Sequence, residues 1–471
     1  MLSMAMAAME MTIVSTAMPT IIGELGGLHL YAWVTASYLL TSTVTVPLYG
    51  KLSDVVGRKP VLLGGISLFL VGSIACALSG SVPVLIAARA LQGLGAGAMQ
   101  PMSLTIVGDL FDIRERARVQ PWFGAVWGIA GLAGPLLGGL IVKHLSWPFV
   151  FWINLPFGVA AMAVLSFAFR EEVKRRAVKV DFLGAALLAA AVVSLLVAVE
   201  GVRTGPLLAL SLVTAVLFVV VERRAPEPVV PLDLFTTRVL GLGNLLAAIL
   251  GGIMIGLATY VPLFVQGVAH GSPTEAGGAI TPMVVGWPIA AYVAGRLLPR
   301  VGYRPLIVIG MIQVGVSALV LPFVAHDPSV SPWTLRVLAT AVGWGMGFAN
   351  TALIIVVQSS VPWERRGIAT ASNMFARTIG ATLAVGAMGA LLSNVVRDEA
   401  NVAPEVMQAI LLRTKTIATV GDGARVVAAL AHGLGLVFWA NALLGVVGIA
   451  AGLFFPSIPA TEPAREVAPA H

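Results

Sequence analysis

The chain has 471 residues, of which 58% are hydrophobic and only 11% are charged. Soluble domains carry about 25% charged residues, so this composition excludes a chain that mostly faces water. The formal net charge is +7, and the single cysteine, Cys76, excludes an internal disulfide framework. We attribute the positive balance to sorting of Lys and Arg across a membrane rather than to nucleic-acid binding.

Apolar runs long enough to cross a bilayer, which takes about 20 residues, recur about fourteen times. The first six are 1–22, 31–52, 61–79, 82–107, 119–142 and 148–169. A pair at 182–200 and 206–221 follows, and the last six are 241–267, 277–298, 305–325, 332–358, 368–392 and 426–455. The pattern predicts an all-α integral membrane protein with two six-helix halves and two inserted central helices.

The predicted domain boundaries follow this grouping. The N-terminal half covers 1–169, a basic linker with the inserted helices covers 170–240, and the C-terminal half covers 241–456 with an outer polar loop at 393–425. The tail 457–471 is rich in Pro and Ala and is expected to be disordered. With loop 50–62 in the cytoplasm, about 20 of the Lys and Arg fall on the cytoplasmic side, so both termini are expected inside.

The first span contains Glu10, the only acidic residue that we place near the middle of any span. A carboxylate in hydrocarbon is costly, so such a residue usually faces a cavity and takes part in transport. Two alternatives are a hydrogen bond that only holds helices together and a helix that starts later, leaving Glu10 near the surface. The run also lacks a basic leader, which favours a retained helix over a signal peptide.

The turn after the second span reads GKLSDVVGRKPVL (50–62), and a degenerate copy, GRLLPRVGYRPLI (295–307), follows the tenth. A basic turn used twice indicates duplicated halves, the usual architecture of a secondary transporter with a midplane site. We expect Asp54 to interact with the N-terminal dipole of a helix, and Arg58 and Lys59 to tie helix ends together as a gate. Gly50 and Gly57 complete this candidate gating set, whose alternative role is only to orient the chain.

Arg89 in the fourth span is the basic counterpart of Glu10, because a buried guanidinium must be paired. A direct ion pair and a link through Gln92 or water both remain open. The same span carries glycines at 93, 95 and 97, which recur at 343, 345 and 347. This constant offset extends the duplication beyond the turns.

The fifth span is rich in glycine, and Gly134, Pro135 and Gly138 are its candidate gating residues. Small residues at helical spacing let helices approach closely, and a proline removes one backbone hydrogen bond. Tight packing alone and a bending helix that seals one gate are both compatible with this pattern.

Polar and aromatic residues within the spans suit a roomy amphipathic pocket better than a narrow sugar site. We find no metal-ligand spacing, phosphate-binding loop or dinucleotide fingerprint, so we expect no metal, no cofactor and no enzyme activity. The candidate cavity residues are Tyr38, Gln92, Trp127, Asn244, Tyr260, Gln266, Trp344, Asn350 and Arg377.

These motifs resemble those of the major facilitator superfamily. Residues 50–62 resemble its signature between helices two and three, 85–97 its fourth-helix motif, and 131–139 its antiporter motif. Residues 9–19, 33–40 and 151–158 resemble motifs of its fourteen-helix drug–proton antiporters. The chain departs from that pattern at Glu10, where the family has Asp, at Pro148, where it has Arg, and in the second turn, which lacks the acid.

The resemblance implies a proton-coupled antiporter that exports amphipathic, cationic or lipophilic drugs from the cytoplasm by alternating access. Glu10 would take the proton-coupling position, Arg89 would support proton transfer, and the proton gradient would supply the energy. A monomer in a bacterial cell membrane, associated with antibiotic resistance, is expected. The alternatives are an exporter of a lipid, siderophore or endogenous metabolite, and a membrane sensor that transports nothing.

Overall fold

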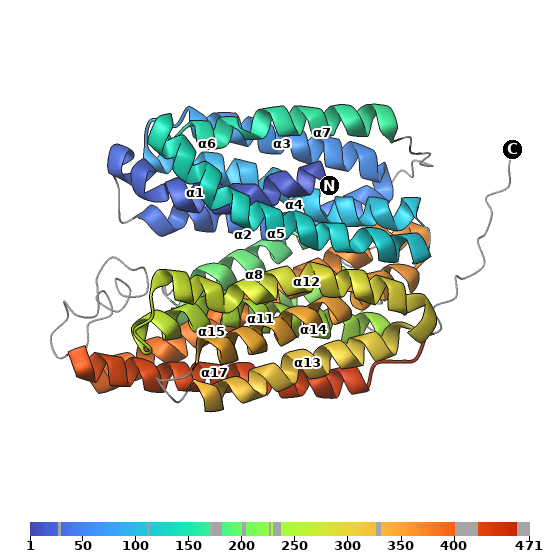
Figure 1. The fold of residues 1–471 in the computed structure, drawn as a ribbon. Coiled ribbons are helices and arrows are strands. Elements are labelled where there is room, and N and C mark those ends of the chain that lie inside the picture. Colours follow the sequence, from blue (N-terminus) through green and yellow to red (C-terminus); the bar gives the residue numbers. More distant parts are fainter. Residues whose placement is uncertain are drawn as a thin grey trace, which may run out of the picture. The chain divides into compact units, whose positions relative to one another are not determined.

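The computed structural model describes residues 1–26, 30–111, 113–169, 171, 181–199, 204–225, 228, 237–325, 331–400 and 423–458. Throughout these ranges the regular structure is helical, without a strand (Figure 1). This confirms the all-α prediction. Most of the basic linker and of loop 393–425, and nearly all of the tail, lie outside the described residues.

Each expected span coincides with a described helix, because each apolar run is long enough to cross a bilayer. The first eight runs correspond to α1 (Leu2–Leu25), α2 (Tyr31–Val56), α3 (Arg58–Ala77), α4 (Val82–Leu110), α5 (Ile113–His144), α6 (Phe149–Trp152) with α7 (Asn154–Ala168), α8 (Phe182–Val199) and α9 (Thr204–Glu222). The others correspond to α11 (Arg238–Gly267), α12 (Pro273–Val301), α13 (Tyr303–Val324), α14 (Pro332–Ser359), α15 (Arg366–Ala400) and α17 (Gly423–Leu453).

The helices gather into two compact units. The first holds the described residues of 1–241 and 354–375, and the second holds those of 242–353 and 376–461. The boundary therefore crosses α14 and α15, and the start of α15 belongs to the first unit. The short 3-10 helix η2 (Trp363–Arg365) that precedes α15 lies in the first unit as well.

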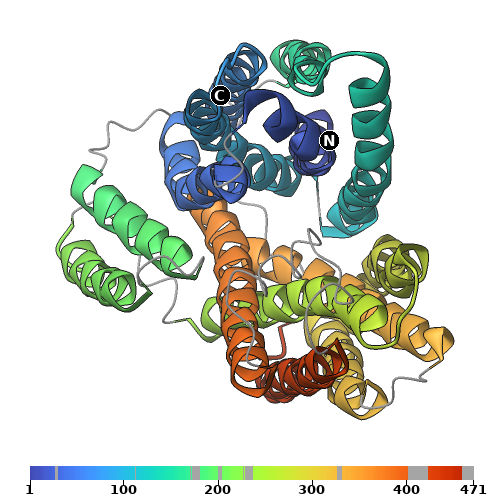
Figure 2. The same cartoon turned by 90° about the vertical axis from the view of Figure 1, so that its left-hand side faces the viewer.

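The inserted helices α8 and α9 pack against each other within the first unit (Figure 2). The Ser211 hydroxyl of α9 donates a hydrogen bond to the Ala191 carbonyl of α8 at 2.9 Å. Helix α8 also contacts α2. Most large apolar side chains of α9 are exposed, as expected for a helix that faces lipid.

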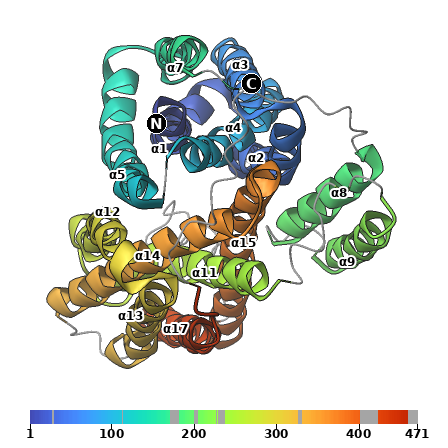
Figure 3. The same ribbon diagram turned by 90° about the vertical axis from the view of Figure 1, so that its right-hand side faces the viewer.

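The repeated glycines make equivalent contacts in the two units. A Cβ atom at Gly93 of α4 would clash with the Tyr38 carbonyl of α2, and one at Gly343 of α14 would clash with the Met283 carbonyl of α12. Close approach of helix backbones needs small residues at the contact. Helix α14 thus packs on α12 as α4 packs on α2, while α13 and α17 pack side by side (Figure 3).

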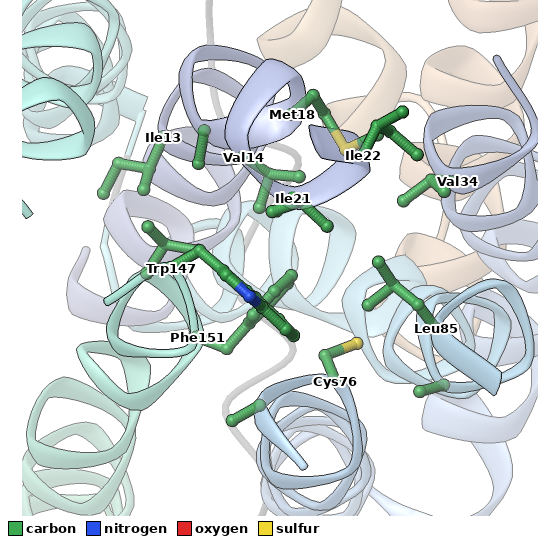
Figure 4. Packing of buried hydrophobic residues seen from close by; sticks show 14 of the residues in the cluster. Ile13, Val14, Met18, Ile21, Ile22, Val34, Cys76, Leu85, Trp147 and Phe151 are labelled. Carbon is green, nitrogen blue, oxygen red and sulfur yellow. The ribbon is translucent and has the colours of Figure 1, made fainter. Parts of the chain in front are cut away.

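A hydrophobic cluster joins α1, α3 and α4 to the segment between α5 and α7 (Figure 4). The rings of Trp147 and Phe151 pack edge to face with centroids 6.3 Å apart. Ile13 and Val14 of α1 are fully buried in the cluster, one turn beyond Glu10. Glu10 therefore lies on α1 one turn before the part of this helix that packs in the apolar cluster.

Candidate proton-coupling site

Glu10 lies in the interior of the first unit, with 1% of its surface exposed. Helix α1 begins at Leu2, so the alternative of a late helix start does not hold. The Glu10 Oε1 atom is 2.5 Å from Arg89 Nη1, and Oε2 accepts a hydrogen bond from Asn154 Nδ2 at 2.6 Å. The two charged side chains pair directly, which answers the question that the sequence left open.

Arg89 is the centre of a wider polar network that links α1, α2, α3, α4 and α7. Its Nη1 also donates to Gln92 Oε1 at 2.6 Å, and its Nε donates to the Val34 carbonyl at 3.3 Å. The guanidinium stacks 4.2 Å from the centroid of the Tyr38 ring. Each face of the charge therefore has a partner, as a buried guanidinium requires.

Ser73 of α3 closes the network on its other side. Its hydroxyl accepts hydrogen bonds from Gln92 Nε2 at 2.7 Å and from Asn154 Nδ2 at 3.3 Å. Ser73 and Asn154 were not among the predicted site residues. The signal was weak for Ser73, one polar residue within an apolar run, whereas Asn154 lies in residues 151–158, whose resemblance to an antiporter motif could have singled it out.

Chemically, this site holds a compensated acid–base pair in a nearly dry environment. A proton added to Glu10 would remove the negative charge that holds Arg89, while Gln92, Val34 and Tyr38 would remain as partners of the guanidinium. The arrangement therefore allows two electrostatic states that differ by one proton on Glu10.

A second polar group, which we call the loop cluster, consists of Asp54, Arg58, Asp109 and residues 363–368. Asp54 accepts hydrogen bonds from the backbone amides of Gly367 at 3.0 Å and Ile368 at 2.9 Å. It therefore caps the first turn of α15, where a negative charge is stabilised by the helix dipole. The sequence predicted a contact with a helix N-terminus from the position of Asp54 near the start of the third span; the helix that it contacts is α15.

Arg58 holds the loop cluster together and is completely buried. It forms ion pairs with Asp54 at 3.0 Å and with Asp109 at 2.9 Å. It also donates to the Trp363 carbonyl at 2.8 Å and stacks 4.0 Å from that residue's ring centroid. One guanidinium thus joins α2, α3, α4 and η2.

Asp54 lies beyond the expected span that ends at residue 52. Burial raises the pKa of its carboxyl to about 7, against the opposite effect of Arg58 and of the two capping amides. Its charge therefore changes close to neutral pH.

Gly50 and Gly134 permit close helix contacts in the first unit. A Cβ atom at Gly50 would lie 2.5 Å from that of Ala371 in α15, and one at Gly134 would clash with the Thr12 hydroxyl of α1. Helix α5 continues without a break across Gly134 and Pro135. Tight packing thus accounts for Gly134, and the role of Pro135 as a hinge stays a prediction.

The candidate cavity residues fall into distinct environments. Tyr38 and Gln92 belong to the Glu10 network. The hydroxyl of Tyr260 donates to the Val385 carbonyl at 2.8 Å. Trp127 is exposed, Asn244 and Asn350 are buried, and Gln266, Trp344 and Arg377 are half-buried.

The two duplicated sets of membrane-length helices, with the buried Glu10–Arg89 pair inside one of them, define a multi-pass membrane transporter. The model of the family described as Major Facilitator Superfamily matches residues 1–385, and the chain belongs to this family. This confirms the family expected from the motifs.

The chain is 36% identical over 405 residues to Multidrug transporter protein MdtP of Bacillus subtilis, covering 83% of this chain and 74% of that one. It is also 36% identical over 410 residues to Multidrug resistance protein 3 of the same species, covering 85% and 80%. Among solved structures, the proton:xylose symporter XylE matches with a TM-score of 0.67 at 14% identity, over 98% of this chain and 95% of that one. The last match concerns the fold alone.

Proposed function

We propose that this protein exports amphipathic compounds from the cytoplasm in exchange for protons, by alternating access. The class of cargo is supported by relatives named as multidrug transporters. The coupling to protons is supported by one observation above all, the buried Glu10–Arg89 pair. No other acidic residue lies near the middle of an expected span.

In this proposal Glu10 exchanges protons and does not bind the cargo directly. Both of its carboxylate oxygens already have donors, Arg89 and Asn154. A cationic substrate, one expectation from the sequence, would have to displace one of these donors. Proton uptake instead needs only that the ion pair loosens, which would alter how α1 is held against α4 and α7.

The loop cluster would act as the cytoplasmic gate. Its contacts fix the start of α15 to α2 and α3 and would have to break whenever the cytoplasmic side opens. The positive-inside distribution of Lys and Arg supports this orientation, with both termini in the cytoplasm of a bacterial cell. A monomer driven by the proton gradient completes the proposal.

The test uses inside-out membrane vesicles with an acidic interior and a fluorescent amphipathic cation such as ethidium. Wild-type protein should concentrate the dye inside the vesicles. Glu10→Gln, a permanently neutral mimic, should bind dye but lose gradient-driven accumulation, whereas Glu10→Asp should keep part of it. Glu275→Gln, which changes an acid at the start of α12, is the matched control and should transport normally.

Accumulation by Glu10→Gln with wild-type pH dependence would place proton coupling elsewhere. If the wild type moves neither this dye nor neutral and anionic amphipaths in response to the gradient, the protein is not a proton-driven exporter. Export of a lipid, siderophore or endogenous metabolite on the same scaffold would appear in this assay as transport of a different cargo with the same dependence on Glu10.

A further inference from the structure

Arg377 is a cation deep within a membrane-length helix of the second unit. It lies eleven residues beyond Arg366, the first residue of α15, which is about 16 Å along the helix axis at ~1.5 Å per residue. Its side chain is half-buried. A guanidinium at this depth usually faces the interior of the bundle or a cavity rather than lipid.

The described part of the second unit offers no acidic side chain at the depth of Arg377. None of the six expected spans of the C-terminal half contains Asp or Glu. The described acids of this unit are Glu275 in the first turn of α12 and Asp398 and Glu399 in the last turn of α15. Within the described parts of the chain, Arg377 has no hydrogen-bond or ion-pair partner.

Two other basic residues of the second unit differ from Arg377, because each lies near a helix end and stacks on an aromatic ring. Arg336 lies in the second turn of α14, where a long side chain reaches the membrane surface, and it stacks 4.9 Å from the Trp333 ring centroid. Arg296, near the end of α12, stacks 3.8 Å from the Tyr292 ring centroid. Arg377 has neither a nearby helix end nor an aromatic partner among the described residues.

The central acid of the chain is not available to Arg377 either. Both oxygens of Glu10 are occupied within the first unit by Arg89 and Asn154. With Glu10 ionised, the three charges in the middle of the spans sum to +1, and protonation of Glu10 makes this sum more positive. Among the described residues, then, no acidic side chain neutralises Arg377, and a bound molecule with a negative group would supply the counter-charge.

Arg377 packs closely against a glycine of α11, Gly251. The carbonyl of Arg377 lies directly against Gly251 of α11, and a Cβ atom at Gly251 would come within 3.0 Å of Arg377 Cγ. Asn244 lies two turns before Gly251 on the same face of α11, by helical periodicity. A side chain at position 251 would push the stem of Arg377 aside.

We infer that Arg377 binds the oxyanion group of the exported compound, so that anionic amphipaths carrying a carboxylate, sulfonate or phosphate are substrates. A guanidinium binds such groups through two parallel hydrogen bonds, which favours an oxyanion over a chloride ion. This inference rests on the proposed export function and adds anionic amphipaths to the cargo of the same transporter.

Binding can be measured on the purified full-length protein with dansyl-labelled undecanoate and its primary amide, which differ only in the carboxylate. Wild-type protein should bind the carboxylate about 10- to 100-fold more tightly than the amide, the range for a charge-assisted hydrogen bond. Arg377→Gln should remove this difference, and Arg377→Lys should retain part of it. Arg336→Gln, the matched loss of a basic residue, should leave the difference intact.

Equal binding of the two probes by wild-type protein, or an unchanged ratio in Arg377→Gln, would overturn the inference. If Arg377→Gln does not purify as a folded protein, the wild-type ratio and Arg377→Lys decide the question. Because binding needs no proton gradient, a carboxylate preference without gradient-driven uptake would contradict the proposed export while leaving the anion site in place.

A lipid phosphate is the other source of the same chemistry. Phosphatidylglycerol should compete with the carboxylate probe only weakly if the site serves cargo. Displacement of the probe at equimolar phosphatidylglycerol, lost in Arg377→Gln, would assign Arg377 to a lipid site and overturn its assignment to substrate.

Discussion

The two copies of the basic turn, 50–62 and 295–307, share their backbone conformation. Gly57 and Gly302 occupy equivalent positions with φ of 110° and 80°. Side chains other than that of glycine rarely adopt these values, so each copy needs glycine at this position. In both copies the next helix begins at the residue after the glycine, Arg58 or Tyr303.

The residue one position further along, Lys59 in the first copy and Arg304 in the second, makes the same kind of hydrogen bond in both copies. Lys59 donates to the carbonyls of Ser166 at 2.8 Å and Phe169 at 2.6 Å, at the end of α7. Arg304 donates to the Leu453 carbonyl at 2.9 Å, at the end of α17. Each copy thus ties the start of the third helix of its half to the end of the last one.

The copies differ where charge is buried. Asp54 and Arg58 correspond to Pro299 and Tyr303, so the second copy has neither the acid that caps another helix nor the arginine that binds two acids. Both copies thus share a joint, the hydrogen bonds that tie the third helix of each half to its last helix. Only the first copy makes the charged contact with α15. A contact present in one half only is suited to a switch, whereas the shared joint serves packing.

Arg58→Leu should give the largest effect. It would leave Asp54 and Asp109 buried without their common counter-charge, and breaking a buried ion pair in this way costs about 3–5 kcal/mol. The equivalent change in the second copy, Tyr303→Phe, should cost about 1 kcal/mol or less, because only a hydroxyl is lost. Thermal unfolding of the purified variants, together with dye transport, measures the difference.

Equal unfolding temperatures for Arg58→Leu and Tyr303→Phe would show that the loop cluster adds no stability beyond the shared turn. A double variant, Arg58→Leu with Asp54→Asn, sharpens the test. It should recover part of the loss, since one of the two uncompensated acids is removed.

Asp54→Asn should have an intermediate effect. The amides of Gly367 and Ile368 donate to different oxygens of Asp54, and an asparagine keeps only one of these acceptors. It also lacks the charge that favours a helix N-terminus. A loss of about 1 kcal/mol corresponds to about a fivefold change in the closed-to-open ratio of the gate. Turnover of the variant in vesicles should fall by a similar factor while insertion stays normal.

The pH dependence of this effect follows from the Asp54 carboxyl, whose pKa burial raises to about 7. Above that pH the carboxylate is charged and caps α15, and below it wild-type protein carries a neutral group like the variant. The ratio of wild-type to variant turnover should therefore be largest above pH 7 and approach one at lower pH. Identical turnover across this range would leave the loop only the role of orienting the chain.

The sequence was sufficient to predict the helices and to single out Glu10, Arg89 and Asp54, each of which makes buried polar contacts in the structure. Hydropathy sets span positions directly, because unpaired backbone groups are excluded from lipid. A lone acid or base in such a run also stands out against the apolar residues around it. These predictions needed no knowledge of how helices turn toward one another.

The partners of those residues could not be predicted in the same way. Asn154 completes the Glu10 site and Asp109 completes the loop cluster, but each contact depends on the rotation of a helix about its axis. Glu171 is a further example, since it accepts hydrogen bonds from the amides of Arg58 and Lys59 and so caps α3. It follows a span end in the sequence, where charged residues are common and carry no distinctive signal.

The smallest expected effect concerns the shared joint. Lys59→Met and Arg304→Met each remove exposed hydrogen bonds to carbonyl groups at a helix end, and such contacts contribute about 1 kcal/mol or less. Both variants should lower the unfolding temperature slightly and to a similar extent, while Lys59→Arg should be neutral. Transport should stay near the wild-type level in all three, because the Asp54 and Arg58 contacts remain. A strong transport defect in Lys59→Met without one in Arg304→Met would mean that Lys59 acts in gating, as the sequence suggested, and that the joint is not equivalent in the two halves.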